Sequence, residues 1–353
     1  MSNLITKRNV VILVFGLLVV GFAARSMLNL PAVQDAALTR GAAVLAERAS
    51  EPFPESESLR VFVCGSASPL GNTDQAQACI AVLTPDHFYL IDSGAGSTAN
   101  ISRLGLPMAS LEGVLLTHFH SDHIAEIYEV NLTSWVQGRP KPLTIYGPTG
   151  VDEVTEAVNA GYRLDRIYRT GHHGEELLPP ELGVLTHETI APGVILEDGD
   201  LKITAYVSEH PPIHPAVGYR FDYKGRSVVI SGDSNVTDET LKIVDGADLL
   251  LHDALSLPIV TTSSEAMAEA GQKRISKIMA DVLDYHASTD SLIDLGTKTD
   301  VDMVVFYHLV PTPMNALLEG LFMRGAPDTY LLAEDRMVFE LPIGSDDILV
   351  TRP

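Results

Sequence analysis

Apolar residues along the chain fall into short runs that are separated by polar or glycine-containing turns. The runs at 60–64, 78–83 and 88–91 predict three successive strands, and 193–231 is a second strand-rich stretch with a hairpin turn at 223–226. Apolar positions at helical spacing predict helices over the segments 32–49, 124–137, 151–168 and 264–283. Because strands and helices come in groups, we expect an α/β fold with two halves, each a sheet with helices on its outside.

The N-terminal region differs in composition from the rest of the chain. Lys7 and Arg8 precede fifteen uncharged residues, 10–24, as in a secretory signal. A spanning helix needs about 20 residues, so a cleaved signal peptide and an uncleaved membrane anchor both stay open for 1–25. Either predicts a protein that is periplasmic, or anchored in the membrane and facing away from the cytoplasm. Residues 26–58 are expected to form a helix and a linker, and 59–353 the folded domain.

The overall charge bears on the choice of partner. Of the residues, 24 are basic and 46 acidic, which gives a formal net charge of −22. Such a field repels phosphate backbones and makes nucleic acid an unlikely partner. A small anionic substrate stays compatible with the sequence, because bound metal ions reverse the charge locally.

The segment 117–123, Thr-His-Phe-His-Ser-Asp-His, is the densest group of candidate metal ligands and directly follows an apolar run. Imidazole nitrogens and carboxylate oxygens suit Zn²⁺ where no thiolate is offered. In an extended chain, His118 and His120 point the same way and can bind one metal. Asp122 and His123 are then free to face a second metal.

Further ligands are expected at the ends of later strands. His210, Asp233 and His308 each follow an apolar run, and His214 is an alternative to His210. A carboxylate can bridge two cations, since each oxygen can face one of them, and this makes Asp233 the candidate bridge.

Together these residues resemble the metallo-β-lactamase superfamily, and more closely its ribonuclease Z-like branch, which also includes a class of zinc arylsulfatases. The resemblance covers about 59–341 and implies an αββα sandwich of two mixed sheets flanked by helices. It also implies two Zn²⁺ ions per chain, with Mn²⁺ or Fe²⁺ as alternatives. One ion would be held by His118, His120 and His210 and the other by Asp122, His123 and His308, with Asp233 bridging both.

Two further segments are similar to that branch. His286, in the segment Asp-Tyr-His-Ala-Ser-Thr at 284–289, matches a histidine that donates a proton there. By this resemblance His286 protonates the leaving oxygen, and Asp122 orients or deprotonates the attacking water. The pair His252 and Asp253 resembles a buried His–acid pair beside the metals, for which we expect a supporting role.

The segment 151–200 departs from the branch, in which a basic, glycine-rich arm holds transfer RNA. It contains three arginines against eleven Asp and Glu residues, and such a surface repels RNA. The pair His172 and His173 within it is interpreted as a solvated loop or as a lid over the pocket.

We therefore expect a zinc-dependent hydrolase, in which two metals activate a bridging hydroxide against small phosphodiesters or sulfate esters. Three alternatives stay open. The first is a transfer-RNA 3′-end endoribonuclease, which the branch favours and the export signal and acidity oppose. The others are a lactonase or β-lactamase, and a metal-binding protein without turnover.

Two smaller questions also stay open. Cys64 and Cys79 form either a disulfide or two buried thiols. Trp135 and the segment 317–323 belong to a pocket wall, to the contact of a homodimer, or to the core.

Overall fold

The computed structural model describes residues 9–10, 12, 14–15, 17, 21–22, 25–50, 53–71 and 74–353. The chain divides into two compact units, Met1–Pro54 and Glu55–Pro353. In the first unit, helix α2 spans Pro31–Ser50 and confirms the helix expected at 32–49. The predicted signal or anchor segment, 1–25, lies largely outside the described residues.

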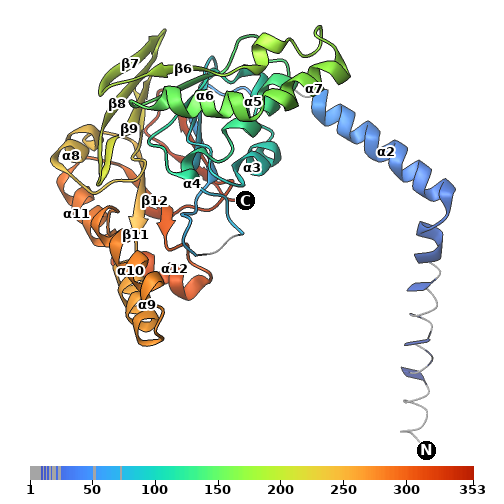
Figure 1. Cartoon of the computed structure of the whole chain (residues 1–353). Helices are drawn as coiled ribbons and strands as arrows, with labels where there is room; N and C mark the ends of the chain where they lie inside the picture. The colour runs from blue at the N-terminus through green and yellow to red at the C-terminus, as the bar shows by residue number, and fades with distance from the viewer. Residues whose placement is uncertain are drawn as a thin grey trace, which may run out of the picture. The chain divides into compact units, whose positions relative to one another are not determined.

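The described part of the second unit contains two mixed sheets (Figure 1). In the first sheet, with strand order β15-β14-β1-β2-β3-β4-β5-β6, β1 to β3 are antiparallel and β3 to β6 parallel. Its strands are β1 (Ser58–Gly65), β2 (Cys79–Leu83), β3 (Phe88–Ile91), β4 (Gly113–Leu115), β5 (Thr144–Gly147), β6 (Thr186–Thr189), β14 (Val338–Pro342) and β15 (Leu349–Thr351).

The second sheet has the strand order β13-β12-β11-β10-β9-β8-β7, in which β7 to β10 are antiparallel and β10 to β13 parallel. Its strands are β7 (Gly193–Asp198), β8 (Leu201–His210), β9 (Ile213–Tyr223), β10 (Arg226–Ile230), β11 (Leu249–Leu255), β12 (Met303–Val310) and β13 (Tyr330–Leu332). The hairpin turn expected at 223–226 joins β9 to β10, where Lys224 and Gly225 both have positive φ.

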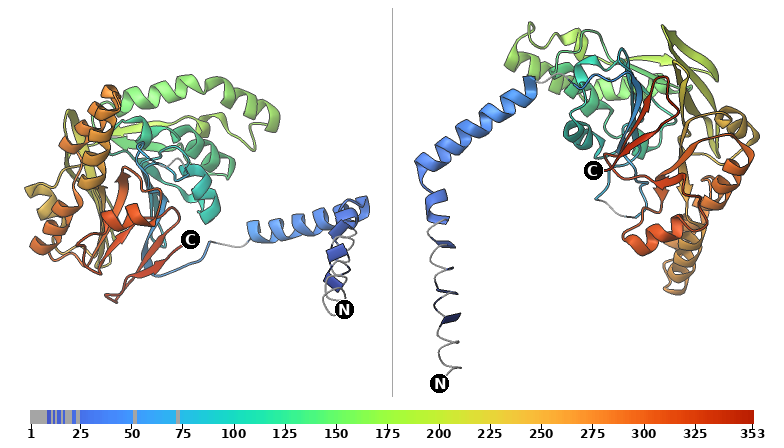
Figure 2. Two further views of the ribbon diagram at one scale, coloured as in Figure 1. Left: turned by 90° about the horizontal axis from the view of Figure 1, so that it is seen from below. Right: turned by 180° about the vertical axis from the view of Figure 1, so that it is seen from behind.

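Helices cover the outer faces of both sheets, as the two views in Figure 2 show. The helices are α3 (Ser97–Leu104), α4 (Ser121–Ile124), α5 (Ile127–Val136), α6 (Val151–Gly161), α7 (Arg163–His173), α8 (Asp238–Val244), α9 (Leu257–Glu269), α10 (Lys273–Asp281), α11 (Thr289–Lys298) and α12 (Ala316–Phe322). Single 3₁₀ turns occur at η1 (Met108–Ser110), η2 (Pro180–Gly183) and η3 (Val282–Asp284). This confirms the expected αββα architecture.

Alternation along buried strands explains how four layers form. Leu249 and Leu251 of β11 belong to the core between the sheets, together with Val61 of β1 and Phe221 of β9. Leu250, between them, points to the opposite face and packs in a second core with residues of α8, α11 and α12. A strand such as β11 is therefore buried throughout its length.

Two predicted helices are wrong in their extent. The segment 151–168 forms two helices, α6 and α7, that meet at Tyr162, whose ring stacks on Tyr128 with 3.7 Å between centroids. The segment 264–283 is also divided, because Gly271, with φ +77°, turns the chain between α9 and α10. His172 and His173, expected in a loop or lid, form the exposed last turn of α7.

The two smaller questions have structural answers. Cys64 and Cys79 form a disulfide between β1 and β2. Trp135 is 1% exposed and packs with Tyr128 and Leu178 in a small core under α5, so it is a packing residue. In the segment 317–323, Leu317 is 77% exposed, whereas Phe322 is buried in the core and Leu318, Leu321 and Met323 pack against that core.

Candidate metal centre

The His-rich segment, 117–123, connects a strand of the first sheet to a helix. It follows β4, and α4 begins at Ser121 within it. Asp92, at the end of the neighbouring strand β3, accepts hydrogen bonds from the backbone N–H and the hydroxyl of Thr117, both at 2.8 Å. These bonds fix the start of the segment, and so the direction in which its histidines leave the backbone.

One cluster of candidate ligands comprises His118, His120, His210 and Asp233, whose ligand atoms lie within 4.8 Å of one another. Nδ1 of His120 lies 2.9 Å from Nε2 of His118 and 3.4 Å from Nε2 of His210. Oδ2 of Asp233 lies 3.9 Å from the Nε2 atoms of both His118 and His210. His120 is exposed to the pocket, whereas the other three side chains are buried.

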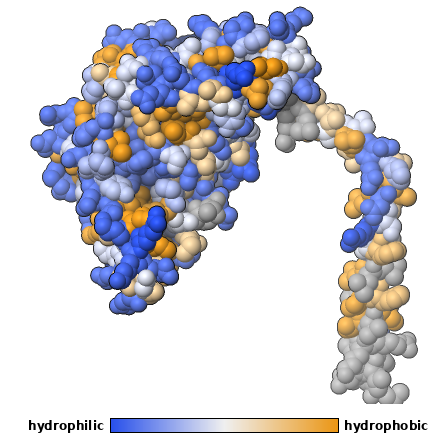
Figure 3. All heavy atoms as spheres, viewed as in Figure 1, coloured by the Kyte–Doolittle hydropathy of each residue, from blue (hydrophilic) through white to orange (hydrophobic). Residues whose placement is uncertain are grey.

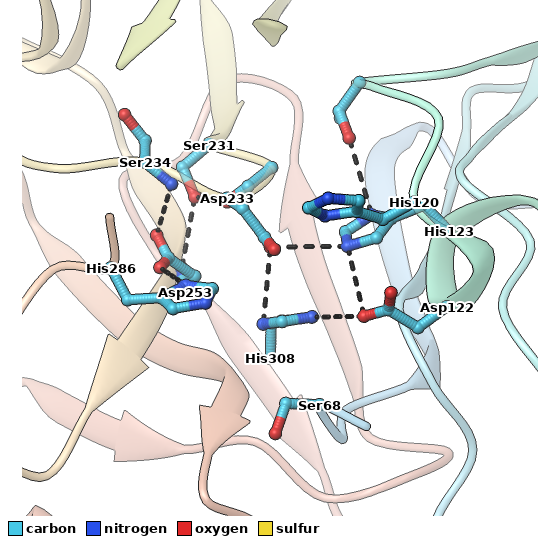
Figure 4. A network of polar contacts seen from close by, with 12 residues as sticks. Ser68, His120, Asp122, His123, Ser231, Asp233, Ser234, Asp253, His286 and His308 are labelled. Carbon is cyan, nitrogen blue, oxygen red and sulfur yellow. Dashed lines mark hydrogen bonds and ion pairs between the residues drawn. The ribbon is translucent and has the colours of Figure 1, made fainter. Parts of the chain in front are cut away.

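A second cluster comprises Asp122, His123, His308 and again Asp233. Oδ2 of Asp122 lies 3.1 Å from Nε2 of His308 and 3.5 Å from Nε2 of His123. The other oxygen of Asp233, Oδ1, lies 3.4 Å from His123 Nε2 and 3.3 Å from His308 Nδ1 (Figure 4). Asp233 therefore presents one oxygen to each cluster.

Three atoms of the second cluster test whether a cation fits there. His123 Nε2, Asp233 Oδ1 and His308 Nδ1 are buried and have no hydrogen-bond partner. Leaving buried polar atoms unpaired costs free energy, so such atoms indicate an absent binding partner. A cation among these nitrogen and oxygen donors satisfies all three, and the donor set is one that zinc accepts.

Other groups orient the candidate ligands. Oδ2 of Asp92 lies 2.7 Å from Nδ1 of His123, and the backbone oxygen of Tyr285 lies 3.0 Å from Nδ1 of His210. Both contacts leave the Nε2 atom directed at the cluster, which is the usual arrangement of a metal-binding histidine.

Burial and neighbouring charges set the protonation of two candidate ligands, His118 and Asp233. Burial, together with the neighbouring His123, lowers the pKa of His118 well below its ordinary value, so this imidazole is neutral and its lone pair free. Burial acts against ionisation of Asp233, but the imidazoles of His308 and His123 hold the pKa of this carboxyl well below its usual range. Asp233 is therefore a carboxylate, as a bridging ligand must be.

Beside the clusters, the carboxylate of Asp253 contacts two histidines. Oδ2 of Asp253 lies 2.8 Å from Nδ1 of His286, and its Oδ1 lies 2.9 Å from Nδ1 of His252. Asp253 also accepts a hydrogen bond of 3.1 Å from the backbone N–H of Ser234, next to the shared ligand Asp233. His252 is fully buried, whereas His286 lines the pocket.

The pocket at the clusters has a volume of about 250 Å³. The pocket is lined by candidate ligands and His286 and also by apolar side chains, among them Leu70, Ile278, Val310 and the ring of Tyr285. This lining can bind a substrate that combines a reactive polar group with an apolar group.

Comparisons with known proteins identify the family. Residues 87–309 match the beta-lactamase superfamily domain. The chain is 34% identical over 256 residues to ribonuclease Z of Mycobacterium bovis (strain BCG / Pasteur 1173P2), covering 72% of this chain and 86% of that protein. It is 30% identical over 292 residues to ribonuclease Z of Mycolicibacterium gilvum (strain PYR-GCK), covering 82% and 94%. The chain belongs to the ribonuclease Z family of the β-lactamase superfamily.

Solved structures agree on the fold. The metallo-β-lactamase fold protein YhfI from Bacillus subtilis matches with a TM-score of 0.58 at 18% identity, over 81% of this chain and all of that one. The short form of human tRNase Z matches with a TM-score of 0.55 at 20% identity, over 80% and 100%.

Membership of the ribonuclease Z family corrects the predicted location. Export, whether to the periplasm or as a membrane-anchored protein facing outside the cytoplasm, is wrong, because the relatives that cover most of the chain are ribonucleases Z. Among the described residues, no helix combines the length and the apolar character needed to cross a membrane. The family also weakens the expectation that nucleic acid is an unlikely partner, which rested on the net charge and on the acidic segment 151–200.

In this ribonuclease Z family member the structure brings together all seven predicted ligands and His286. His214 is exposed and belongs to none of the His and carboxylate clusters found among the described residues. The orienting role of Asp92 was missed by sequence reasoning. A signal was present in the sequence, since Asp92 directly follows the apolar run 88–91 and precedes a glycine turn. In the structure its φ is +58°.

Proposed function

We propose that this protein is a metal-dependent phosphodiesterase of the ribonuclease Z type that hydrolyses RNA, with transfer-RNA precursors as its class of substrate. The observation that carries the proposal is the arrangement of the pocket in a chain 34% identical to a ribonuclease Z: two ligand clusters share Asp233, and His286 lies beside them. The predicted sulfate ester activity has no support among the relatives.

Zinc is the proposed cation, at two ions per chain, since the donors are imidazoles and carboxylates; Mn²⁺ and Fe²⁺ are the alternatives. His118, His120 and His210 would hold one ion, Asp122, His123 and His308 the other, and Asp233 both. The bound cations would supply Lewis-acid polarisation of a phosphoryl oxygen and a nucleophile available at neutral pH.

The chain's own residues account for the proton transfers. In the proposal Asp122, which lines the pocket, orients the attacking water and accepts its proton. The P–O bond to the leaving group breaks, and the leaving oxygen takes a proton from His286. Asp253 fixes the His286 ring through Nδ1, so Nε2 is the nitrogen that faces the substrate.

A second candidate is hydrolysis of small phosphodiesters, with a small-molecule ester in place of RNA. The net charge of −22 and the acidic segment 151–200 favour it, because both repel a polyanion at low salt.

The expected assembly is a separate point. A homodimer stays a prediction.

The test uses the full chain loaded with zinc and a transfer-RNA precursor that carries a 3′ extension, at several salt concentrations. The proposal expects one discrete cut, and Asp233→Asn should abolish it. Parallel assays use bis(p-nitrophenyl) phosphate, p-nitrophenyl sulfate, a lactone and a cephalosporin. Cleavage of the small phosphodiester with intact RNA at every salt concentration would select the second candidate. Turnover of the lactone or the cephalosporin alone would select that class, and inactivity on everything would indicate a metal-binding protein without turnover.

A further inference from the structure

The pocket has an apolar wall beside the candidate ligands. It includes Ile278 of α10, Val282 of η3 and Tyr285 from the loop before His286. Val282 is buried in a small core with Leu255, against which Leu70 and Tyr285 pack. The wall is therefore fixed by packing on the body of the domain.

Tyr285 connects this wall to the reactive side of the pocket. Its ring lies edge-on to the ring of His210, with 5.0 Å between centroids and an interplanar angle of 87°. The centroid of His286 lies 4.9 Å away. The Tyr285 ring is thus adjacent to the rings of a candidate ligand and of the candidate proton donor. The Tyr285 side chain is only partly buried.

Charged side chains of both signs lie on the segment that carries the wall. Helix α10 carries Lys273, Arg274 and Lys277, of which Lys277 pairs with Asp281, and the acidic Asp284 directly precedes Tyr285. Arg274 is exposed and precedes Ile278 by four residues, so both lie on the same side of the helix. Figure 3 shows hydrophobic and hydrophilic side chains side by side at the surface over the lower part of this unit, where Figure 1 draws α9 and α10.

We propose that Tyr285, with Ile278 and Val282, forms a subsite that stacks one nucleobase beside the scissile phosphate. The inference rests on the proposed function, since it names the group that accompanies the phosphodiester. A base joins a flat apolar face to an anionic phosphate, which matches an aromatic ring that lies beside a candidate ligand and the candidate proton donor. Aromatic side chains stack with any base, because every base presents a π face. A pocket of about 250 Å³ lies below the usual volume of drug-sized sites and suits one such group.

The experiment compares two phosphodiesters with the same leaving group: thymidine 5′-(p-nitrophenyl) phosphate and methyl p-nitrophenyl phosphate. Only the first carries a base, so the ratio of their kcat/KM values measures what the nucleoside adds. This ratio does not depend on the fraction of folded enzyme. The variants are Tyr285→Leu, which removes the ring, Tyr285→Phe, which keeps it, and Tyr168→Leu, at an exposed position of α7, as a control.

The expected result is a preference for the nucleoside ester that falls roughly 5- to 150-fold in Tyr285→Leu, the range of base–aromatic stacking. Tyr285→Phe and Tyr168→Leu should keep the preference. Hydrolysis of both esters without a preference, or a preference that survives Tyr285→Leu, would overturn the subsite and leave the proposed function intact.

A binding measurement separates the subsite from catalysis. The fluorescence of 2-aminopurine riboside 5′-monophosphate is quenched when its base stacks on a ring. Quenching by the zinc-loaded wild type that is lost in Tyr285→Leu supports the subsite even if neither ester is hydrolysed, in which case the proposed function fails alone. Absence of saturable quenching in the wild type overturns the subsite.

Discussion

Oδ2 of Asp253 lies 2.8 Å from Nδ1 of His286, in a pocket that also holds both clusters of candidate ligands. The contact fixes one ring nitrogen of His286 and leaves the other for a substrate. A His–carboxylate pair that is buried on the carboxylate side and open on the imidazole side is well suited to deliver a proton repeatedly to one point.

Replacing His286 by Ala should lower kcat roughly 100-fold or more on a diester with a poor leaving group, because an alkoxide needs a proton to leave. The loss should be much smaller with p-nitrophenolate, which leaves unprotonated. The measurement compares both substrates in the variant and in His172→Ala, an exposed control on α7. Equal losses on the two substrates would rule out the acid role.

Asp253→Asn should reproduce part of that pattern. The amide keeps the shape of the carboxylate but cannot accept hydrogen bonds from both His252 and His286, so it loses control of the ring orientation. We expect kcat to fall about 10-fold or more on the poor leaving group, with cation content unchanged. Elemental analysis of the same preparation checks the second point, and loss of cations there would mean that Asp253 supports the ligands instead.

Removal of cations should destabilise the fold as well as stop catalysis. Two negative side chains, Asp122 and Asp233, are buried beside the imidazoles, and bound cations compensate their charge. A cation at 100 times its Kd adds about 2.7 kcal/mol to the free energy of unfolding. Chelator should therefore lower Tm, and Zn²⁺ should restore it in proportion to occupancy. A Tm indifferent to chelator, with no bound metal in folded protein, would refute the metal centre.

Asp92→Asn should weaken zinc binding about 10- to 100-fold, the usual effect of removing the group that orients a ligating histidine. The affected ion is the one near His123, so competition with a chromophoric chelator should show one weakened site and one normal site. The exposed Asp86→Asn is the control. Equal weakening of both sites would argue for a general loss of structure around Thr117.

Reduction of the disulfide between Cys64 and Cys79 should lower the free energy of unfolding by about 3 kcal/mol, the value for closure of a loop of this length. Denaturant unfolding with and without reductant measures it. A change below about 0.5 kcal/mol would contradict this prediction. It would mean that the reduced, unfolded chain already keeps the residues of β1 and β2 close together.

Local pattern was sufficient for part of this structure. β1, β2 and β3 lie where apolar runs predicted them, because strands buried on both faces are apolar without interruption. Candidate ligands were found for a similar reason, since imidazoles and carboxylates at the ends of buried strands are costly to desolvate unless they bind a cation.

Tertiary packing decided the rest. The break at Tyr162 depends on stacking against Tyr128, a contact that no sequence period encodes. The orienting role of Asp92 depends on β3 and β4 lying side by side. Net charge is a property of the whole surface and not of one site, so the expectation about nucleic acid that rested on it is weakened by the family of the chain.

Gly232 joins the two halves of the centre at close range. Its φ is +63°, and a Cβ there would lie 2.7 Å from Cβ of Thr117, so the Asp233 loop fits against the His-rich loop only without a side chain. The candidate ligands come from both sheets of the sandwich, so a cation bound among them would cross-link the two sheets. Loosening the core between the sheets, for example with Phe221→Ala, should then speed the exchange of bound zinc at denaturant concentrations that are too low to unfold the domain.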